Sequence, residues 1–209
     1  MEVVISPQVD NGVLNRRNKS SMDIFSIQQR INSCQKCQLC AQRRQPVMGE
    51  GDIRNKIMLI GEAPGATEDE LGRPFVGRSG NLLRQLMEEV GLTRENFFIT
   101  NMVKCRPPEN RIPTKEEIEA CWPFLKEQID ELSPALVVTA GNTPTQWFLN
   151  TRKGVTALRG QFYTWTLEKK EMQIRPIFHP SYLLRNRSRE KGRPIDLTLF
   201  DLREIATFL

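Results

Sequence analysis

The sequence is short of histidine and of long apolar runs, and these shortages exclude several functions. No apolar stretch approaches the ~20 residues that a transmembrane helix needs, and residues 1–22 lack the apolar core of a secretory signal. We therefore expect a cytosolic protein that does not enter membranes. The glycine-rich run GEAPG neither continues into Gly-Lys-Ser/Thr nor matches GxGxxG, which disfavours a nucleotide-hydrolysing enzyme.

Length and composition predict one domain. A chain of 209 residues with 39% apolar content can bury one sizeable core. Residues 1–22 are polar and show no apolar periodicity. We expect them to form a disordered extension, followed by a domain over residues 23–209 that acts as a monomer.

Positive charge is concentrated near the C-terminus. The net charge is +5, and five basic side chains fall within nine residues, namely Arg185, Arg187, Arg189, Lys191 and Arg193. Such a stretch suits a phosphate backbone. A solvated surface loop is the alternative interpretation of the same charges.

Five cysteines are present, and four of them have separations that suit a metal centre. Cys34 and Cys37 form the run CQKC, and Cys105 and Cys121 follow far down the chain. Thiols stay reduced in the cytosol, so an odd count indicates metal ligation with one cysteine to spare rather than disulfides. Spacing does not distinguish a tetrahedral zinc site from an iron-sulfur cluster, nor does it rule out Cys40 as a ligand.

Strand-like and helix-like segments alternate along the chain. Short apolar runs at residues 56–61, 97–101 and 135–141 are each followed by a helical pattern, and residues 161–167 and 172–179 form a hairpin around the turn EKKE. This order predicts an α/β fold with a mostly parallel sheet covered on both faces. The loops GEAPG, TNMVK, AGN and HPS begin at strand ends, so they should converge on one cleft.

Two features near these strand ends are ambiguous on their own. GEAPG fits a phosphate-cradling turn, but an ordinary tight strand-to-helix turn explains it equally well. His179 in FHPSYLLR is the sole histidine, and a lone histidine is more often structural than catalytic. Its place at a strand end allows a second role, in which a neutral imidazole donates a hydrogen bond to an oxygen that gains negative charge.

Taken together, GEAPGATEDELGRPFVGRSG, TNMVKCRPPENRIP, HPSYLLR, CQKCQL and EACWPFLKEQ resemble the family 4 uracil-DNA glycosylases, the iron-sulfur branch of the uracil-DNA glycosylase superfamily. The resemblance covers roughly residues 24–207 in the expected order. It implies a three-layer α/β/α sandwich, for which we expect four strands in a mostly parallel central sheet. It also implies a 4Fe-4S cluster held by Cys34, Cys37, Cys105 and Cys121.

The same resemblance implies a role for each part of a base-binding pocket. Phe75 would stack on the extruded base, and Asn101 would read the uracil edge by donating to O4 and accepting from N3–H. His179 would stabilise the departing uracil anion, and Glu62 would position the attacking water. The ordinary alternatives are a core phenylalanine for Phe75 and a strand-end cap for Asn101.

Further residues are assigned by position in the family motifs. Gly61, Ala63 and Gly65 would line the uracil pocket, where Ala63 and Gly65 replace an aspartate and a tyrosine of the better-known GQDPYH signature. Glu68 is the candidate for excluding the thymine methyl group. Leu183 would be the intercalating wedge, although packing in the core is its alternative, and Ser181, Arg185 and Arg187 would bind phosphates.

These assignments predict a monofunctional glycosylase that hydrolyses the N-glycosidic bond of deoxyuridine in single- or double-stranded DNA and so initiates base excision repair. No Schiff-base lysine is evident, so we expect no lyase activity. Two rivals remain open at this point: a relative with broader specificity for hypoxanthine or xanthine, and a cluster-bearing protein that binds DNA without cutting it.

Overall fold

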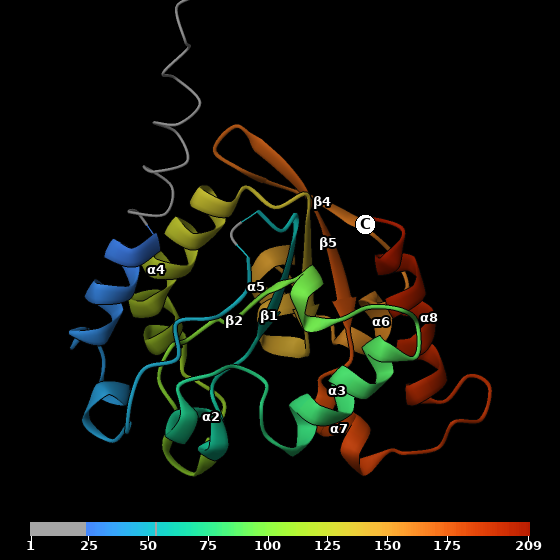
Figure 1. Cartoon of the computed structure of the whole chain (residues 1–209), viewed down its shortest axis with the longest axis horizontal. Helices are drawn as coiled ribbons and strands as arrows, with labels where there is room; N and C mark the ends of the chain where they lie inside the picture. Colours follow the sequence, from blue (N-terminus) through green and yellow to red (C-terminus); the bar gives the residue numbers. More distant parts are fainter. Residues whose placement is uncertain (1–23, 53) are drawn as a thin grey trace, which may run out of the picture.

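A five-stranded sheet runs through the centre of the computed structural model, which describes residues 24–52 and 54–209 (Figure 1). The strand order in this part of the chain is β2-β1-β3-β5-β4. The strands are β1 (Ile57–Gly61), β2 (Phe98–Asn101), β3 (Leu136–Ala140), β4 (Tyr163–Leu167) and β5 (Lys170–Ile177). The expected extension, residues 1–22, lies outside the described residues.

The α/β class is confirmed, but the expected number of four strands is wrong. β2, β1, β3 and β5 pair in parallel, and β4 adds a fifth strand by pairing antiparallel to β5. The hairpin turn is also shorter than expected, because Leu167 pairs with Lys170 and leaves Glu168 and Lys169 as the turn. A two-residue turn holds β4 close enough to extend the ladder of β5.

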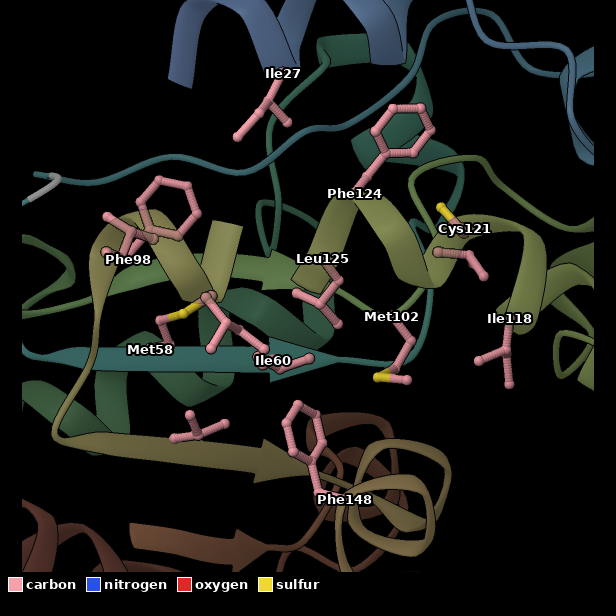
Figure 2. Close-up of a cluster of buried hydrophobic side chains, with 14 of the residues drawn as sticks. Ile27, Met58, Ile60, Phe98, Met102, Ile118, Cys121, Phe124, Leu125 and Phe148 are labelled. Atoms are coloured by element: carbon pink, nitrogen blue, oxygen red, sulfur yellow. The ribbon is translucent and has the colours of Figure 1, made fainter. Parts of the chain in front are cut away.

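Helices cover both faces of the sheet, because alternate strand residues point to opposite sides. Met58 and Ile60 of β1 join one apolar cluster, and Ile57 and Leu59 join the other. Figure 2 shows the first cluster, where the helix at residues 24–32, α4 (Lys115–Leu132) and α5 (Asn142–Leu149) pack on the sheet. On the other face lie α3 (Arg78–Glu88), α6 (Val155–Leu158), α7 (Pro180–Arg185) and α8 (Pro194–Ala206). This is the expected α/β/α sandwich.

Helix α4 begins with a capping box. The Thr114 side chain accepts a hydrogen bond from the backbone N–H of Glu117, and the Glu117 carboxylate accepts from the backbone N–H of Thr114. This reciprocal capping box satisfies two donors that a helix start would otherwise leave without partners. Its position matters because α4 carries Cys121 in its second turn.

Two short helices replace segments that were expected to be loops. α2 (Ala66–Leu71) follows GEAPG, and α7 follows His179. Single 3₁₀ turns cover Gln38–Ala41, Arg94–Asn96 and Pro108–Asn110. None of the helices in residues 24–52 and 54–209 is both long and apolar enough to span a bilayer.

Candidate active site

A cleft opens at the carboxyl ends of β1, β2 and β5, with a volume of about 370 Å³. Four residues expected to form one pocket line it together, although they come from four separate parts of the sequence: Glu62, Phe75, Asn101 and His179. Also lining it are Ala63, Pro64, Gly65, Glu68, Ser79, Pro107, Asn110, Arg111, Ser181 and Arg185. The cleft therefore lies where parallel sheets bind ligands.

Gly61 brings Asn101 and Phe75 together. Gly61 and Asn101 are register partners at the ends of β1 and β2. A Cβ atom on Gly61 would lie 2.4 Å from Asn101 Oδ1 and 2.6 Å from Phe75 Cζ, so a side chain does not fit between them. Only glycine allows the amide and the ring to approach this closely.

Asn101 is supported from below by a buried lysine. Lys104 is 1% exposed, and its Nζ donates to the backbone oxygen of Asn101 at 2.9 Å, to Thr100 Oγ1 at 2.6 Å and to Gln128 Oε1 at 2.7 Å. These three bonds use all the donors of an ammonium group. They fix the backbone from which the Asn101 amide projects into the cleft.

The loop that carries Phe75 is held in a demanding conformation. Phe75 has a φ of 53°, in the left-handed region that few aromatic residues adopt. Arg94 donates to its carbonyl oxygen at 3.1 Å, and Glu68 Oε1 accepts from the backbone N–H groups of Val76 and Gly77 at 3.0 and 2.7 Å. The Glu68 carboxylate thus anchors the loop, which the sequence did not indicate; the role predicted for it in thymine exclusion remains a prediction.

His179 has a defined hydrogen-bonding state. It is the N-cap of α7, and its Nδ1 accepts from the Ser181 backbone N–H at 3.2 Å and lies 2.6 Å from Ser181 Oγ. Burial, with a smaller effect from the positive charge of Arg185, lowers the pKa of His179 to about 4. Since Nδ1 is an acceptor, the neutral ring carries its proton on Nε2, and that nitrogen remains as a donor.

Glu62 follows β1 at the floor of the cleft. Its Oε2 accepts a hydrogen bond from the hydroxyl of Thr143, which lies in the first turn of α5. Burial raises the pKa of the Glu62 carboxyl, and the bond from Thr143 offsets part of that rise. A carboxylate in a cleft with a raised pKa is a common feature of sites that handle protons.

Sequence reasoning missed several residues of this site. Thr143, Lys104, Asn110 and Arg111 were not singled out, although Asn110 and Arg111 line the cleft. TNMVK and PPENR contain three of them, so the motifs pointed to the segments without identifying the side chains. Asn110 has a φ of 56°, and its Oδ1 accepts from Arg106 Nε at 2.8 Å.

Three of the predicted DNA contacts line one of two clefts, and the fourth, Leu183, lines neither. Leu183 has 0% exposure and joins the apolar core on the α3 and α8 face, as its alternative interpretation expected, and its role as a wedge remains a prediction. α7 packs against α3, and this turns Leu183 inward. The neighbouring Tyr182 is 38% exposed.

The second cleft is basic and lies on the other side of α7. It has a volume of about 470 Å³ and contains the expected Arg187, whereas Ser181 and Arg185 line the first cleft. Its other lining residues are Arg78, Asn81, Leu82, Gln85, Leu184, Arg189 and Ile195. Arg189 is paired with Glu89 at 2.8 Å, and carboxylates are absent from this lining.

All five cysteines of the chain line one small cavity beneath α4. Cys105 and Cys121 are buried, and Cys34, Cys37 and Cys40 are half-buried. Arg43 donates to Cys105 Sγ at 2.9 Å and to the carbonyl oxygen of Cys34 at 3.0 Å, and the Lys104 backbone N–H donates to Cys121 Sγ at 3.3 Å. The four predicted ligands are therefore together, but Cys40 is not set apart from them.

The donor set fits a thiolate-bound group. Burial raises the pKa of Cys105 to about 11 and raises those of Cys37 and Cys121, so these thiols stay protonated unless a cation takes the proton's place. Within residues 24–52 and 54–209, no three His, Cys, Asp or Glu side chains converge closely enough to hold one metal ion.

Comparison with known proteins gives matches over most of the chain. A family model described as the uracil DNA glycosylase superfamily matches residues 48–203, which include every residue of the cleft. A type-4 uracil-DNA glycosylase of Thermotoga maritima is 44% identical over 189 residues, covering 90% of this chain and 94% of the relative. An enzyme of the same name from Sulfurisphaera tokodaii is 44% identical over 165 residues, covering 77% of this chain and 75% of the relative. Another from Pyrobaculum aerophilum is 37% identical over 183 residues, covering 86% of this chain and 93% of the relative.

Proposed function

We propose, from the premise that this chain belongs to the type-4 uracil-DNA glycosylases of the uracil DNA glycosylase superfamily, that it hydrolyses the N-glycosidic bond of deoxyuridine in DNA. The products are free uracil and an abasic site, which begins base excision repair. The observation that carries the proposal is the convergence of Glu62, Phe75, Asn101 and His179 on one cleft of about 370 Å³.

The first step is extrusion of the uracil from the base stack into this cleft, at a cost of a few kcal/mol. The ring of Phe75 stacks on the base and offsets part of that cost. The Asn101 amide donates to uracil O4 and accepts from N3–H, with its backbone fixed by Lys104. Cytosine has a donor at position 4 and no proton on N3, so this amide in one orientation rejects it.

His179 acts on the leaving group. As the glycosidic bond breaks, negative charge gathers on uracil O2, and a neutral imidazole with its proton on Nε2 donates to that oxygen. The Ser181 N–H and hydroxyl hold the ring in this tautomer through Nδ1. A preorganised donor of this kind contributes about 3 to 4 kcal/mol in well-studied acyl-transfer sites.

Glu62 acts on the other side of the bond. Its carboxylate positions a water for attack on C1′ of the sugar, and its negative charge stabilises the oxocarbenium-like transition state. The water oxygen bonds to C1′, its proton leaves to solvent, and the uracil anion takes a proton after release. The same charge requires Glu62 to be ionised, so activity should fall at acid pH.

Smaller residues shape the rest of the uracil pocket. Gly61, Ala63 and Gly65 leave room for the ring, and a Cβ on Gly65 would lie 2.8 Å from Glu68 Oε2. We keep Glu68 as the candidate for excluding thymine, acting through the loop that it holds.

The DNA strand passes from the first cleft over α7 to the second. Ser181 and Arg185 bind phosphates beside the flipped nucleotide, and Arg187 with Arg78 binds the next part of the backbone. Exposed Tyr182 is a second candidate wedge beside Leu183. We propose that a monomer acts on both single- and double-stranded DNA in the cytosol.

Cys34, Cys37, Cys105 and Cys121 are the proposed ligands of a 4Fe-4S cluster. The resemblance to the iron-sulfur branch of the superfamily favours the cluster over a zinc ion, which four thiolates would also hold. The cluster would order the segment before Cys105, which contains the cleft residue Asn101, and the segment between Cys105 and Cys121, which contains the cleft residue Asn110. Held by these four thiolates, the cluster would have a structural role here.

A base-release assay tests the proposal. Purified protein is incubated with matched oligonucleotides that carry uracil, hypoxanthine, xanthine or thymine, and abasic sites are revealed by alkali. We expect cleavage at uracil alone, lost in a Glu62→Gln, His179→Ala double variant. Retained DNA binding without cleavage would instead support a non-catalytic DNA-binding protein.

A further inference from the structure

Thr143 lies between the two catalytic candidates because of the strand order. β3 sits between β1 and β5 in the sheet, and α5 begins directly after β3. The first turn of α5 is therefore flanked by Glu62, which follows β1, and by His179, which follows β5. From there the Thr143 hydroxyl donates to Glu62 Oε2.

Because of this bond, the two carboxylate oxygens of Glu62 differ in their hydrogen-bond partners. Oε2 is taken by Thr143, and Oε1 is left for a partner in the cleft. A glutamate side chain has three rotatable bonds, so it needs a fixed contact to keep one oxygen aimed at a reacting water. The hydroxyl of Thr143 is anchored on a helix and provides that contact.

We propose that Thr143 is the positioning residue for Glu62, fixing its carboxylate so that Oε1 holds the attacking water. This inference rests on the proposed role of Glu62 in hydrolysis. The charged and titratable groups that share the cleft with Glu62 are Glu68, Arg111, His179 and Arg185. Of the protein groups that act on its carboxyl, Thr143 is the hydrogen-bond donor, and loss of that donor raises the pKa further.

Thr143→Val removes the donor and nearly keeps the side-chain shape. The acid limb of the single-turnover rate should move up by about 1 pH unit, since hydrogen bonds to charged groups are among the stronger ones. At any pH well below the acid limb of the parent the rate should therefore fall about tenfold, with the Kd for uracil-containing DNA unchanged. Thr143→Ser keeps a hydroxyl and should restore the parent profile.

The experiment measures single-turnover uracil release from pH 4.5 to 9 for the parent, Thr143→Val, Thr143→Ser and Thr143→Ala, with Thr156→Val as a control on the exposed face of α6. Thr143→Ala repeats the test if the valine variant does not fold. On a Glu62→Gln background, Thr143→Val should cause no further loss.

The outcomes distinguish a failure of the role of Thr143 from a failure of the proposed role of Glu62. A parent-like pH profile in both Thr143→Val and Thr143→Ala, with Glu62→Gln severely impaired, overturns the role of Thr143 and leaves that of Glu62 standing. A parent-like rate in Glu62→Gln instead overturns the role of Glu62. Equal losses from Thr143→Val with and without Glu62→Gln would also overturn the inference.

Discussion

Replacing Gly61 by alanine should separate the two residues that recognise uracil. The added Cβ would lie 2.4 Å from Asn101 Oδ1 and 2.6 Å from Phe75 Cζ, whereas ordinary contacts begin at 3.4 Å. The amide must therefore retreat by about 1 Å, the difference between 3.4 and 2.4 Å. Retreat of Phe75 is restricted, because its carbonyl oxygen lies against Gly80, where a Cβ would come within 2.1 Å of it.

The size of the effect follows from that displacement. A misplacement of about 1 Å in a reacting complex costs on the order of 10²-fold in rate. Overpacking a tight site costs about 1–3 kcal/mol of folding free energy, which corresponds to a fall of about 2–12 °C in Tm for a chain of this length. At 25 °C the lower activity of Gly61→Ala should therefore come from the slower reaction and not from unfolding of the variant.

The assay compares Gly61→Ala with Gly154→Ala. At Gly154 the nearest atom to an added Cβ is Asn142 Oδ1 at 3.7 Å, an ordinary contact. Single-turnover uracil release and thermal unfolding are measured on both variants and the parent. If Gly61→Ala excises uracil within threefold of the parent while its Tm is unchanged, the close approach of Asn101 and Phe75 is not what the site depends on.

Three further predictions concern the base reader, the leaving-group donor and the cysteines. Asn101→Asp should lower uracil excision at least tenfold at pH 7 and reduce the preference for uracil over cytosine, because the donor to O4 is lost. Competition between uracil- and cytosine-containing substrates measures that preference, and an unchanged preference would contradict the role of Asn101. His179→Ala should lower the single-turnover rate about 10- to 1000-fold with the Kd for DNA largely kept. Burial lowers the pKa of His179 from 6.5 to about 4. The stability that depends on its neutral ring is therefore complete above pH 6.5 and is lost as the pH falls through 4. The Tm of His179→Ala should fall less than that of the parent across this window, and parallel curves of Tm against pH would refute the assignment. Cys105→Ser should reduce the iron bound per chain and the brown colour of the protein, and Cys40→Ser should leave both as they are; bound zinc in place of iron would rule out the cluster.

The local sequence contains enough information for the sheet and for the position of the cleft. Short apolar runs followed by helical patterns predicted β1, β2 and β3, and burial on both faces is the physical reason that these runs are continuously apolar. Parallel strands place their carboxyl ends on one edge, and strand direction therefore predicts that Glu62, Asn101 and His179 meet there.

Leu183 marks the limit of that reasoning. Two adjacent leucines in a six-residue helix, Leu183 and Leu184, look equivalent in the sequence, and the packing of α7 on α3 decides which of them faces the core. The strand count is a different matter: the sequence predicted the hairpin that β4 and β5 form, and the expected number of four, given with the family resemblance, did not include both of its strands.

By itself, the sequence determined the fold class, the edge of the sheet that bears the cleft, and the residue types gathered there, because these follow from apolar periodicity and from strand direction. Only the tertiary structure decided which donors hold each side chain: Thr143 on Glu62, Ser181 on His179, and Lys104 beneath Asn101. Hydrogen bonds depend on distances of a few tenths of an ångström between elements far apart in the chain, and such distances exist only after the layers have packed.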